Sequence, residues 1–340
     1  MGKVYSYAAN VLHNFYPDAP KVSIKSVLVT KDNKKLNKEL AYRYGFEEVT
    51  TSLEKITQND QINAVYVASP NNFHYEQVVS SLEANKNILC EKPFTESLSQ
   101  AQELVKLKDK KISLVGNMVF EYRFIPAIQE IKSILNSGKL GEINQFRFMY
   151  LHGSYAEERE ITWRLKKGTG GALVDLGPHV IDLVQHMLGP INIIGSNMQA
   201  KFPGREVDDY AQILCRTIEG IDGYLEVSRL STGSLDDLRI EIHGNEGSIS
   251  WSLQELNYFK LFMKNSDYPG YKTIPCFSAK ESKSDFPPPK VSSGWLMPHV
   301  HCLYSFAKQI EDSSFDDPSS ANFKDGFNVQ KVIDDIKSLS

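Results

Sequence analysis

The sequence lacks the patterns that mark several classes of protein. Its four cysteines, Cys90, Cys215, Cys276 and Cys302, form no C-x-x-C pair and show no zinc-ligand spacing. No apolar run is long enough for a membrane span, and the N-terminus has no signal-peptide core. The net charge of −4 gives no basic face for nucleic acid. We therefore expect a cytoplasmic protein that binds neither nucleic acid nor membrane.

The chain has 340 residues, which is enough to bury more than one core. We expect two domains, residues 1–117 and 118–340. In the first, helices alternate with short apolar strands, which predicts a doubly wound parallel sheet of the Rossmann type, an α/β fold. The helices expected there are 4–15, 36–44, 75–84 and 97–107, and the strands are 22–29, 62–68, 87–91 and 112–115.

After Gly116 strands dominate, which predicts an α+β domain with a large, mostly antiparallel sheet. A hairpin turn is expected at 244–247 and a surface loop at 278–293. The expected strands are 143–151, 191–198, 210–217, 223–230, 238–243, 247–251 and 258–263. The expected helices are 126–135, 178–188, 300–310 and 326–339.

Glu91-Lys92-Pro93 follows the apolar run 87–90 directly. The carboxyl ends of strands in open α/β sheets are where ligands bind, and the proline ends the strand because it has no amide donor. Lys92 therefore either pairs structurally with Glu91 or acts on a substrate.

A second informative string runs from Gly170-Gly171 through Asp175 and His179 to Asp182. If Pro178 begins a helix, Asp175 and His179 can approach each other as an acid–base pair in which the carboxylate sets the imidazole tautomer. The alternative is that Asp175 caps the helix and His179 is a buried structural histidine.

His186 shares one helical face with His179 and Asp182, a spacing that could hold a metal. Because His186 lies at the expected helix end, we interpret it as a partner of the helix dipole or of the core. We predict no metal site.

Taken together, these two strings resemble the glucose–fructose oxidoreductase/inositol dehydrogenase (Gfo/Idh/MocA) family of NAD(P)-dependent dehydrogenases. The resemblance covers nearly the whole chain, and its motifs occur in the family's order. The further matches are Ala68-Ser69-Pro70-Asn71 with His74, Arg123-Phe124-x-Pro126, 137–141, Trp163-Arg164, 208–211 and Asp325-Gly326.

The resemblance implies a mechanism for Lys92, Asp175 and His179. His179 would accept a proton from a sugar or cyclitol hydroxyl, and Asp175 would hold His179 or bind a neighbouring hydroxyl. The Lys92 ammonium would stabilise the developing alkoxide, and the cofactor would take the hydride. Substrate contacts are expected from Asn117, Arg123, Tyr155 and Asp182. Cofactor contacts are expected from Gly2, Thr30, Lys31, Ser69, Pro70, Asn71, His74, Glu91, Trp163 and Arg164.

Family members often read the adenosine ribose with an aspartate at the end of the second strand, where this chain has Thr30 followed by Lys31. A hydroxyl beside a cation accepts a 2′-phosphate more easily, so the cofactor is NAD or NADP with a preference for NADP. The alternative is that Thr30-Lys31 is an ordinary polar turn.

The chain has no first strand with a G-x-G-x-x-G turn before the helix at 4–15. In the usual strand order that strand is central, so the strand at 22–29 should lack a partner on its inner edge. Either the chain is a fragment or misassigned start of a longer active enzyme, which we favour, or it is a variant that binds dinucleotide poorly.

The leading hypothesis is an NAD(P)-dependent oxidoreductase that acts on a sugar, sugar phosphate or cyclitol. Its rivals are a catalytically weak, sugar-binding regulatory relative and a redox-assisted glycosidase of the same family. The broad second sheet and the family resemblance imply a homo-oligomer, a dimer or tetramer.

Overall fold

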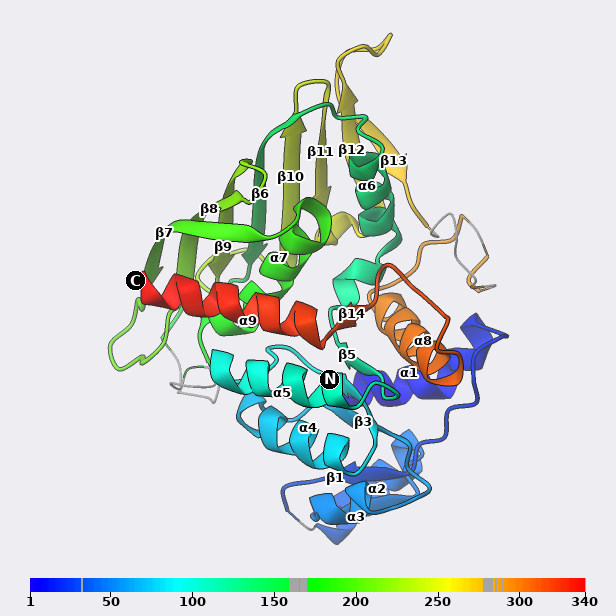
Figure 1. The fold of residues 1–340 in the computed structure, drawn as a ribbon. Coiled ribbons are helices and arrows are strands. Elements are labelled where there is room, and N and C mark those ends of the chain that lie inside the picture. The colour runs from blue at the N-terminus through cyan, green and yellow to red at the C-terminus, as the bar shows by residue number, and fades with distance from the viewer. Residues whose placement is uncertain are drawn as a thin grey trace. The chain divides into compact units, whose positions relative to one another are not determined.

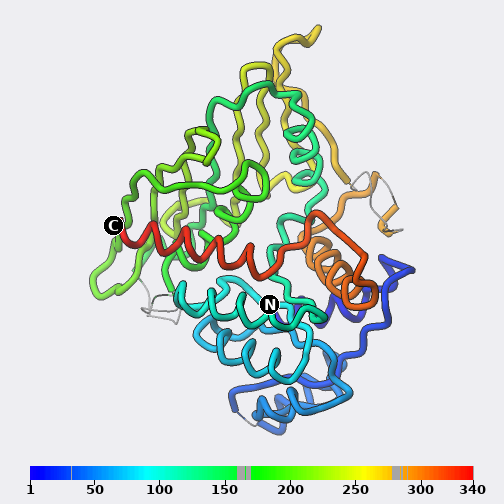
Figure 2. Tube along the Cα trace, in the orientation of Figure 1, coloured from blue at the N-terminus to red at the C-terminus, as the bar shows by residue number. Residues whose placement is uncertain are grey.

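The computed structural model describes residues 1–31, 33–158, 165, 170–277, 284, 286–288 and 290–339. The chain divides into two compact units (Figures 1 and 2). The first comprises Met1–Thr95, Ser99–Phe124 and Lys283–Gly326, and the second Glu96–Leu98, Ile125–Ser282 and Phe327–Ser340. No helix in the described ranges is long and apolar enough to cross a membrane.

The first unit contains two separate sheets. In one, β3 (Ala64–Val67), β4 (Asn87–Cys90) and β5 (Gly116–Met118) run parallel, and β14 (Ala321–Asn322) pairs antiparallel with β5. The helices are α1 (Gly2–Phe15), α2 (Lys34–Tyr44), α3 (Leu53–Thr57), α4 (His74–Glu83), α5 (Leu98–Lys110) and α8 (Met297–Glu311), with the short 3₁₀ helices η1 (Asn71–Phe73) and η2 (Glu121–Phe124).

The other sheet of this unit has only two strands, β1 (Ser26–Leu28) and β2 (Glu48–Thr50), which run parallel. Among the described residues β1 pairs with no strand but β2. The expectation that the strand at 22–29 lacks a partner on its inner edge is therefore confirmed. Only its last part is extended and paired.

The core of the first unit forms around β4, whose four residues are all buried. Such a continuous apolar strand is typical of a parallel sheet covered on both faces. Two apolar clusters in this unit contain residues of both α1 and α8. Their buried members are Tyr5, Leu89, Val119, Phe124, Cys302 and Phe306 in one, and Ala8, Leu12, Tyr16, Ala19, Val300 and Tyr304 in the other.

The second unit has an eight-stranded sheet in the order β13-β12-β11-β10-β6-β9-β8-β7, and α7 lies across one face of it (Figure 1). Among the strands of the described residues in this sheet, only β6 and β9 pair in parallel. The strands are β6 (Ile143–Leu151), β7 (Ile191–Gln199), β8 (Tyr210–Thr217), β9 (Asp222–Ser228), β10 (Asp237–Gly244), β11 (Gly247–Ser252), β12 (Tyr258–Met263) and β13 (Lys272–Pro275). The helices are α6 (Pro126–Asn136), α7 (Ala172–Leu188) and η4 (Leu253–Glu255); α9 (Phe323–Ser338) begins in the first unit and continues into the second.

Both fold-class predictions are confirmed, and the hairpin at 244–247 joins β10 to β11. The strand predicted at 112–115 is wrong. Leu114 closes a turn onto Lys111, and the amide of Val115 is bound by the Asn87 side chain at 2.8 Å, so the ladder begins at Gly116. The helix predicted to start at Pro178 begins six residues earlier, at Ala172, with Pro178 inside it.

Candidate active site

Two loops at the carboxyl ends of β3 and β4 are joined by His74, which is 1% exposed. Its Nε2 lies 2.9 Å from the Ser69 carbonyl oxygen, and its Nδ1 lies 2.9 Å from the Pro93 carbonyl oxygen. Burial lowers the pKa of His74, and the contacts with backbone carbonyls partly offset that effect. His74 thus fastens the Ser69-Pro70 turn to the loop that carries Lys92.

Glu91 lies at the end of β4 and is 5% exposed. Its Oε1 accepts a hydrogen bond of 2.6 Å from the Tyr66 hydroxyl on β3. Burial raises the pKa of Glu91, while the Tyr66 hydrogen bond and the Lys92 charge oppose the rise. The Lys92 side chain is half-buried.

The predicted cofactor residues of the first unit also lie at helix and strand ends. Gly2 is the exposed first residue of α1, and an added Cβ there would meet no atom within 4 Å. Thr30 and Lys31 are exposed after β1, whereas Asn71 is buried at the start of η1. Gly2 and Asn71 therefore begin helices, whereas Thr30 and Lys31 lie in the loop after β1, and the cofactor contacts of all four stay predictions. Trp163 and Arg164 lie outside the described residues.

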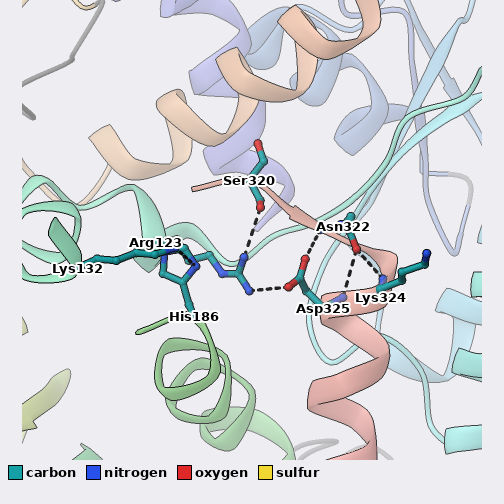
Figure 3. Close-up of polar contacts among 7 residues, drawn as sticks. All are labelled: Arg123, Lys132, His186, Ser320, Asn322, Lys324 and Asp325. Carbon is teal, nitrogen blue, oxygen red and sulfur yellow. Dashed lines mark hydrogen bonds and ion pairs between the residues drawn. The ribbon is translucent and has the colours of Figure 1, made fainter. Parts of the chain in front are cut away.

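Arg123 is engaged within the first unit (Figure 3). Its guanidinium donates to the Ser320 carbonyl oxygen at 3.3 Å and to Asp325 Oδ1 at 3.1 Å. Asp325 Oδ2 accepts from the Asn322 amide at 2.8 Å, and Asn322 Oδ1 accepts from the Lys324 amide at 2.8 Å and the Asp325 amide at 3.3 Å. These reciprocal hydrogen bonds of Asn322 and Asp325 cap the start of α9. Because Arg123 pairs with Asp325, it holds this cap in place. Its role in substrate binding stays a prediction.

Asn117, the other predicted substrate residue of the first unit, is 7% exposed on β5. Its side-chain amide donates to Gln309 Oε1 on α8 at 2.7 Å. This bond ties β5 to α8 within the unit.

In the second unit, Asp208 caps the beginning of α7. Its carboxylate accepts from the Leu173 amide at 2.7 Å, and its carbonyl oxygen accepts from the Ala172 amide at 2.9 Å. Gly171 precedes the helix with a φ of 106°, and an added Cβ would come within 2.3 Å of Asp208 Oδ1. Burial raises the pKa of Asp208 to about 6, although the Leu173 amide opposes the rise. This cap explains why α7 begins at Ala172 rather than at Pro178.

Asp175 lies in the first turn of α7 and pairs with the Arg229 guanidinium. Arg229 also donates to the Ser154 hydroxyl at 3.2 Å and lies 5.3 Å from the ring centre of Tyr155. Tyr155, a predicted substrate residue, is 8% exposed. The ion pair holds the carboxylate of Asp175 toward the loop after β9.

His179 lies four residues after Asp175, one turn further along the same face of α7. It is 6% exposed, and its ring meets the edge of the Tyr150 ring at a centroid distance of 5.7 Å and an angle of 70°. Asp182, the third predicted residue of this helix, is 1% exposed. The structure thus places all three on buried or half-buried turns of α7.

His186 near the end of α7 faces α6 (Figure 3). Lys132 Nζ lies 3.2 Å from its Nδ1 and 3.1 Å from its Nε2. In the described part of the chain, no three histidine, cysteine or carboxylate side chains are grouped so that they could hold a metal ion.

No sequence motif predicted a role for Arg229 or Asp208, although both hold the start of α7. Asp208 lies within the family match at 208–211, and this match is a signal that could have identified it. Nothing in the spacing pointed to Arg229, because it lies 54 residues from Asp175.

A parallel α/β unit with a lysine after a buried strand is followed by a unit in which the helix that carries Asp175 and His179 covers a large sheet, an arrangement compatible with a two-part dinucleotide-dependent oxidoreductase. Residues 1–118 match the oxidoreductase family model with an NAD-binding Rossmann fold, and residues 128–250 match the GFO/IDH/MocA C-terminal domain. The chain belongs to the Gfo/Idh/MocA family.

Several characterised relatives are similar over much of the chain. Levoglucosan dehydrogenase of Pseudarthrobacter phenanthrenivorans is 28% identical, covering 99% of this chain and 92% of the relative. Glucose-6-phosphate 3-dehydrogenase of Bacillus subtilis is 27% identical, covering 81% and 78%. A solved levoglucosan dehydrogenase in complex with NADH and levoglucosan is 27% identical, with a TM-score of 0.92, covering 99% of this chain and 94% of that one.

Proposed function

We propose that the protein transfers a hydride between a hydroxyl-bearing carbon of a sugar, sugar phosphate or cyclitol and a nicotinamide cofactor. The observation that carries the proposal is that a chain of an oxidoreductase family has two features, one in each unit. Lys92 follows a buried central strand, and Asp175 and His179 share one face of α7. Relatives named for dehydrogenation of levoglucosan, glucose 6-phosphate and scyllo-inositol support the substrate class.

In this proposal His179 accepts the hydroxyl proton during oxidation, as a general base. The Lys92 ammonium stabilises the negative charge that develops on the substrate oxygen. Asp175, fixed by Arg229, binds a neighbouring substrate hydroxyl or orients His179. The bound nicotinamide supplies the hydride acceptor.

In this proposal two segments of the first unit form part of a dinucleotide site. The start of α1 has no side-chain cap, which suits it to a phosphate, and Thr30-Lys31 follows β1 where the adenosine ribose is read in this fold. We propose residues 1–117 as the dinucleotide-binding domain, 118–340 as the substrate and oligomerisation domain, and NADP as the preferred cofactor. A titration in which NAD is preferred by more than about tenfold would overturn the cofactor preference.

The deciding experiment is a substrate panel with NAD and with NADP, monitored by formation of the reduced cofactor. The panel contains levoglucosan, glucose 6-phosphate and the inositols, with Lys92→Ala as the matched inactive control. Turnover that disappears in the control supports the proposal. Ligand binding without turnover on any substrate points instead to a regulatory protein. Cleavage of aryl glycosides with catalytic amounts of cofactor points to a glycosidase.

A further inference from the structure

His179 is flanked in the second unit by a polar chain that the proposed mechanism does not use. Tyr150 on β6 is 4% exposed, and its ring makes a T-shaped contact with the His179 ring. The Tyr150 hydroxyl donates to Asp236 Oδ1 at 2.5 Å. The same oxygen lies 2.9 Å from His152 Nε2.

The sheet register brings these groups together. Side chains alternate along β6, so Phe148 and Tyr150 point to one side of it and are buried, and His152 directly follows the strand. Leu151 pairs with Asp237 of β10, which places Asp236 beside His152. The backbone therefore fixes the spacing between the tyrosine, the carboxylate and the histidine.

The surroundings of Asp236 favour its ionised form. Burial tends to raise its pKa, but hydrogen bonds from His152 and Tyr150 and the charge of Arg229 outweigh burial, so the pKa is lowered. An ionised acceptor makes a stronger bond to the Tyr150 hydroxyl than a neutral one. Gln254 also donates to the Asp236 carbonyl oxygen at 2.7 Å, which fixes its backbone.

A phenol ring packed edge-on against an imidazole limits how far the imidazole can rotate. That limit holds only while the phenol itself is fixed, and in this unit Asp236 and His152 fix it. General-base catalysis requires the accepting nitrogen to be correctly placed, and a displacement of about 1 Å can cost about 100-fold in rate.

We propose that Tyr150, Asp236 and His152 form a positioning chain that sets the orientation of the His179 ring. The chain takes no part in proton or hydride transfer. The inference rests on the proposed role of His179 as the base, and it names three residues that set the efficiency of that base.

The test compares Tyr150→Phe and Asp236→Asn with Tyr224→Phe. Tyr224 is the matched control, because its hydroxyl also donates to a carboxylate, Glu226 at 2.8 Å, and the buried neighbours Leu225 and Val227 show that it points to the opposite face of the sheet. We measure kcat and KM, together with the histidine ring signals in NMR spectra of the isotope-labelled protein. The His179 signal is identified by its absence in His179→Gln.

We expect Tyr150→Phe and Asp236→Asn to lower kcat about 10-fold, with KM within about twofold, and to move the His179 signal. His152→Leu should act in the same direction, and His152→Gln, which keeps a donor to Asp236, should restore most of the rate. Tyr224→Phe should change neither readout. Asp236 is 45% exposed, so Asp236→Asn should fold even if Tyr150→Phe does not.

A His179 signal unchanged in the folded variants overturns the inference, whatever happens to the rate. If the wild-type protein turns over no substrate, the proposed function fails, and the NMR comparison alone still decides whether the chain orients His179.

Discussion

The loop after β4 and the first turns of α7 both present charged side chains, but the chain holds them in different ways. The loop is held by His74 at the start of α4, which contacts backbone carbonyls 5 and 19 residues away, and Glu91 bonds to a tyrosine on the adjacent strand. On α7, Asp208 binds the Leu173 amide from 35 residues away in the chain, and Arg229 binds Asp175 from 54 residues away. The first arrangement is built mainly from one βαβ segment, whereas the second depends on side chains that flank distant strands, just before β8 and just after β9.

The largest expected effects on kcat/KM come from one substitution in each of the two regions. Lys92→Ala and His179→Ala should each lower kcat/KM by at least ~100-fold, because each removes a group that acts only in the transition state. Steady-state kinetics with the best substrate of the panel provides the measurement. Near-normal turnover in either variant would remove that residue from the chemistry.

Asp208→Asn tests the cap of α7 through pH. The folded pKa of Asp208, about 6, lies above the ordinary value of 3.8. The contribution of Asp208 to the unfolding free energy of the wild-type protein is therefore fully present below pH 3.8 and is lost as the pH rises through 6. The amide cannot ionise, so the variant should gain roughly 2 kcal/mol relative to wild type between pH 4 and 7.

Urea unfolding at several pH values measures this difference. Asp222→Asn is the control, because Asp222 is fully exposed and its pKa is lowered by Arg216 rather than raised. A difference between Asp208→Asn and wild type that does not change with pH would show that Asp208 is not a buried titrating cap.

Arg229→Met tests whether a distant ion pair fixes Asp175. We expect kcat/KM to fall about 10-fold, since the freed carboxylate loses its orientation while the methionine keeps much of the packing volume. Arg216→Met is the matched control, because it removes an arginine that pairs with Asp222 on the same sheet but at an exposed site. Equal kinetics in the two variants would contradict a special role for Arg229.

His74→Asn should have the smallest effect. An asparagine can keep one of the two carbonyl contacts, so we expect a loss of about 1 kcal/mol of unfolding free energy and about a fivefold lower kcat/KM. Thermal unfolding and kinetics measure the two. An effect larger than that of Arg229→Met would reverse the comparison and make the β4 loop the more sensitive region.

The same contrast explains what could be predicted from the sequence. The fully buried strand β4, the strand β6 with its alternating burial and the hairpin at 244–247 follow from local sequence patterns, so both fold classes were correctly predicted. The start predicted for α7, Pro178, was wrong. A proline is a common first residue of a helix, whereas the residue that caps α7, Asp208, comes after the helix in the chain. A side chain that acts from a distant loop leaves no periodic signal near the residue it holds.

The division of the first unit into two sheets has a consequence for local unfolding. The β1–β2 pair is short, α2 has no buried residue, and few apolar side chains join this segment to the β4 core. Amide protons of β1 and β2 should therefore exchange with solvent sooner than those of β3 and β4. Since Thr30-Lys31 follows β1, a dinucleotide that binds there would slow that exchange, so its adenosine end would stabilise the most easily opened part of this unit.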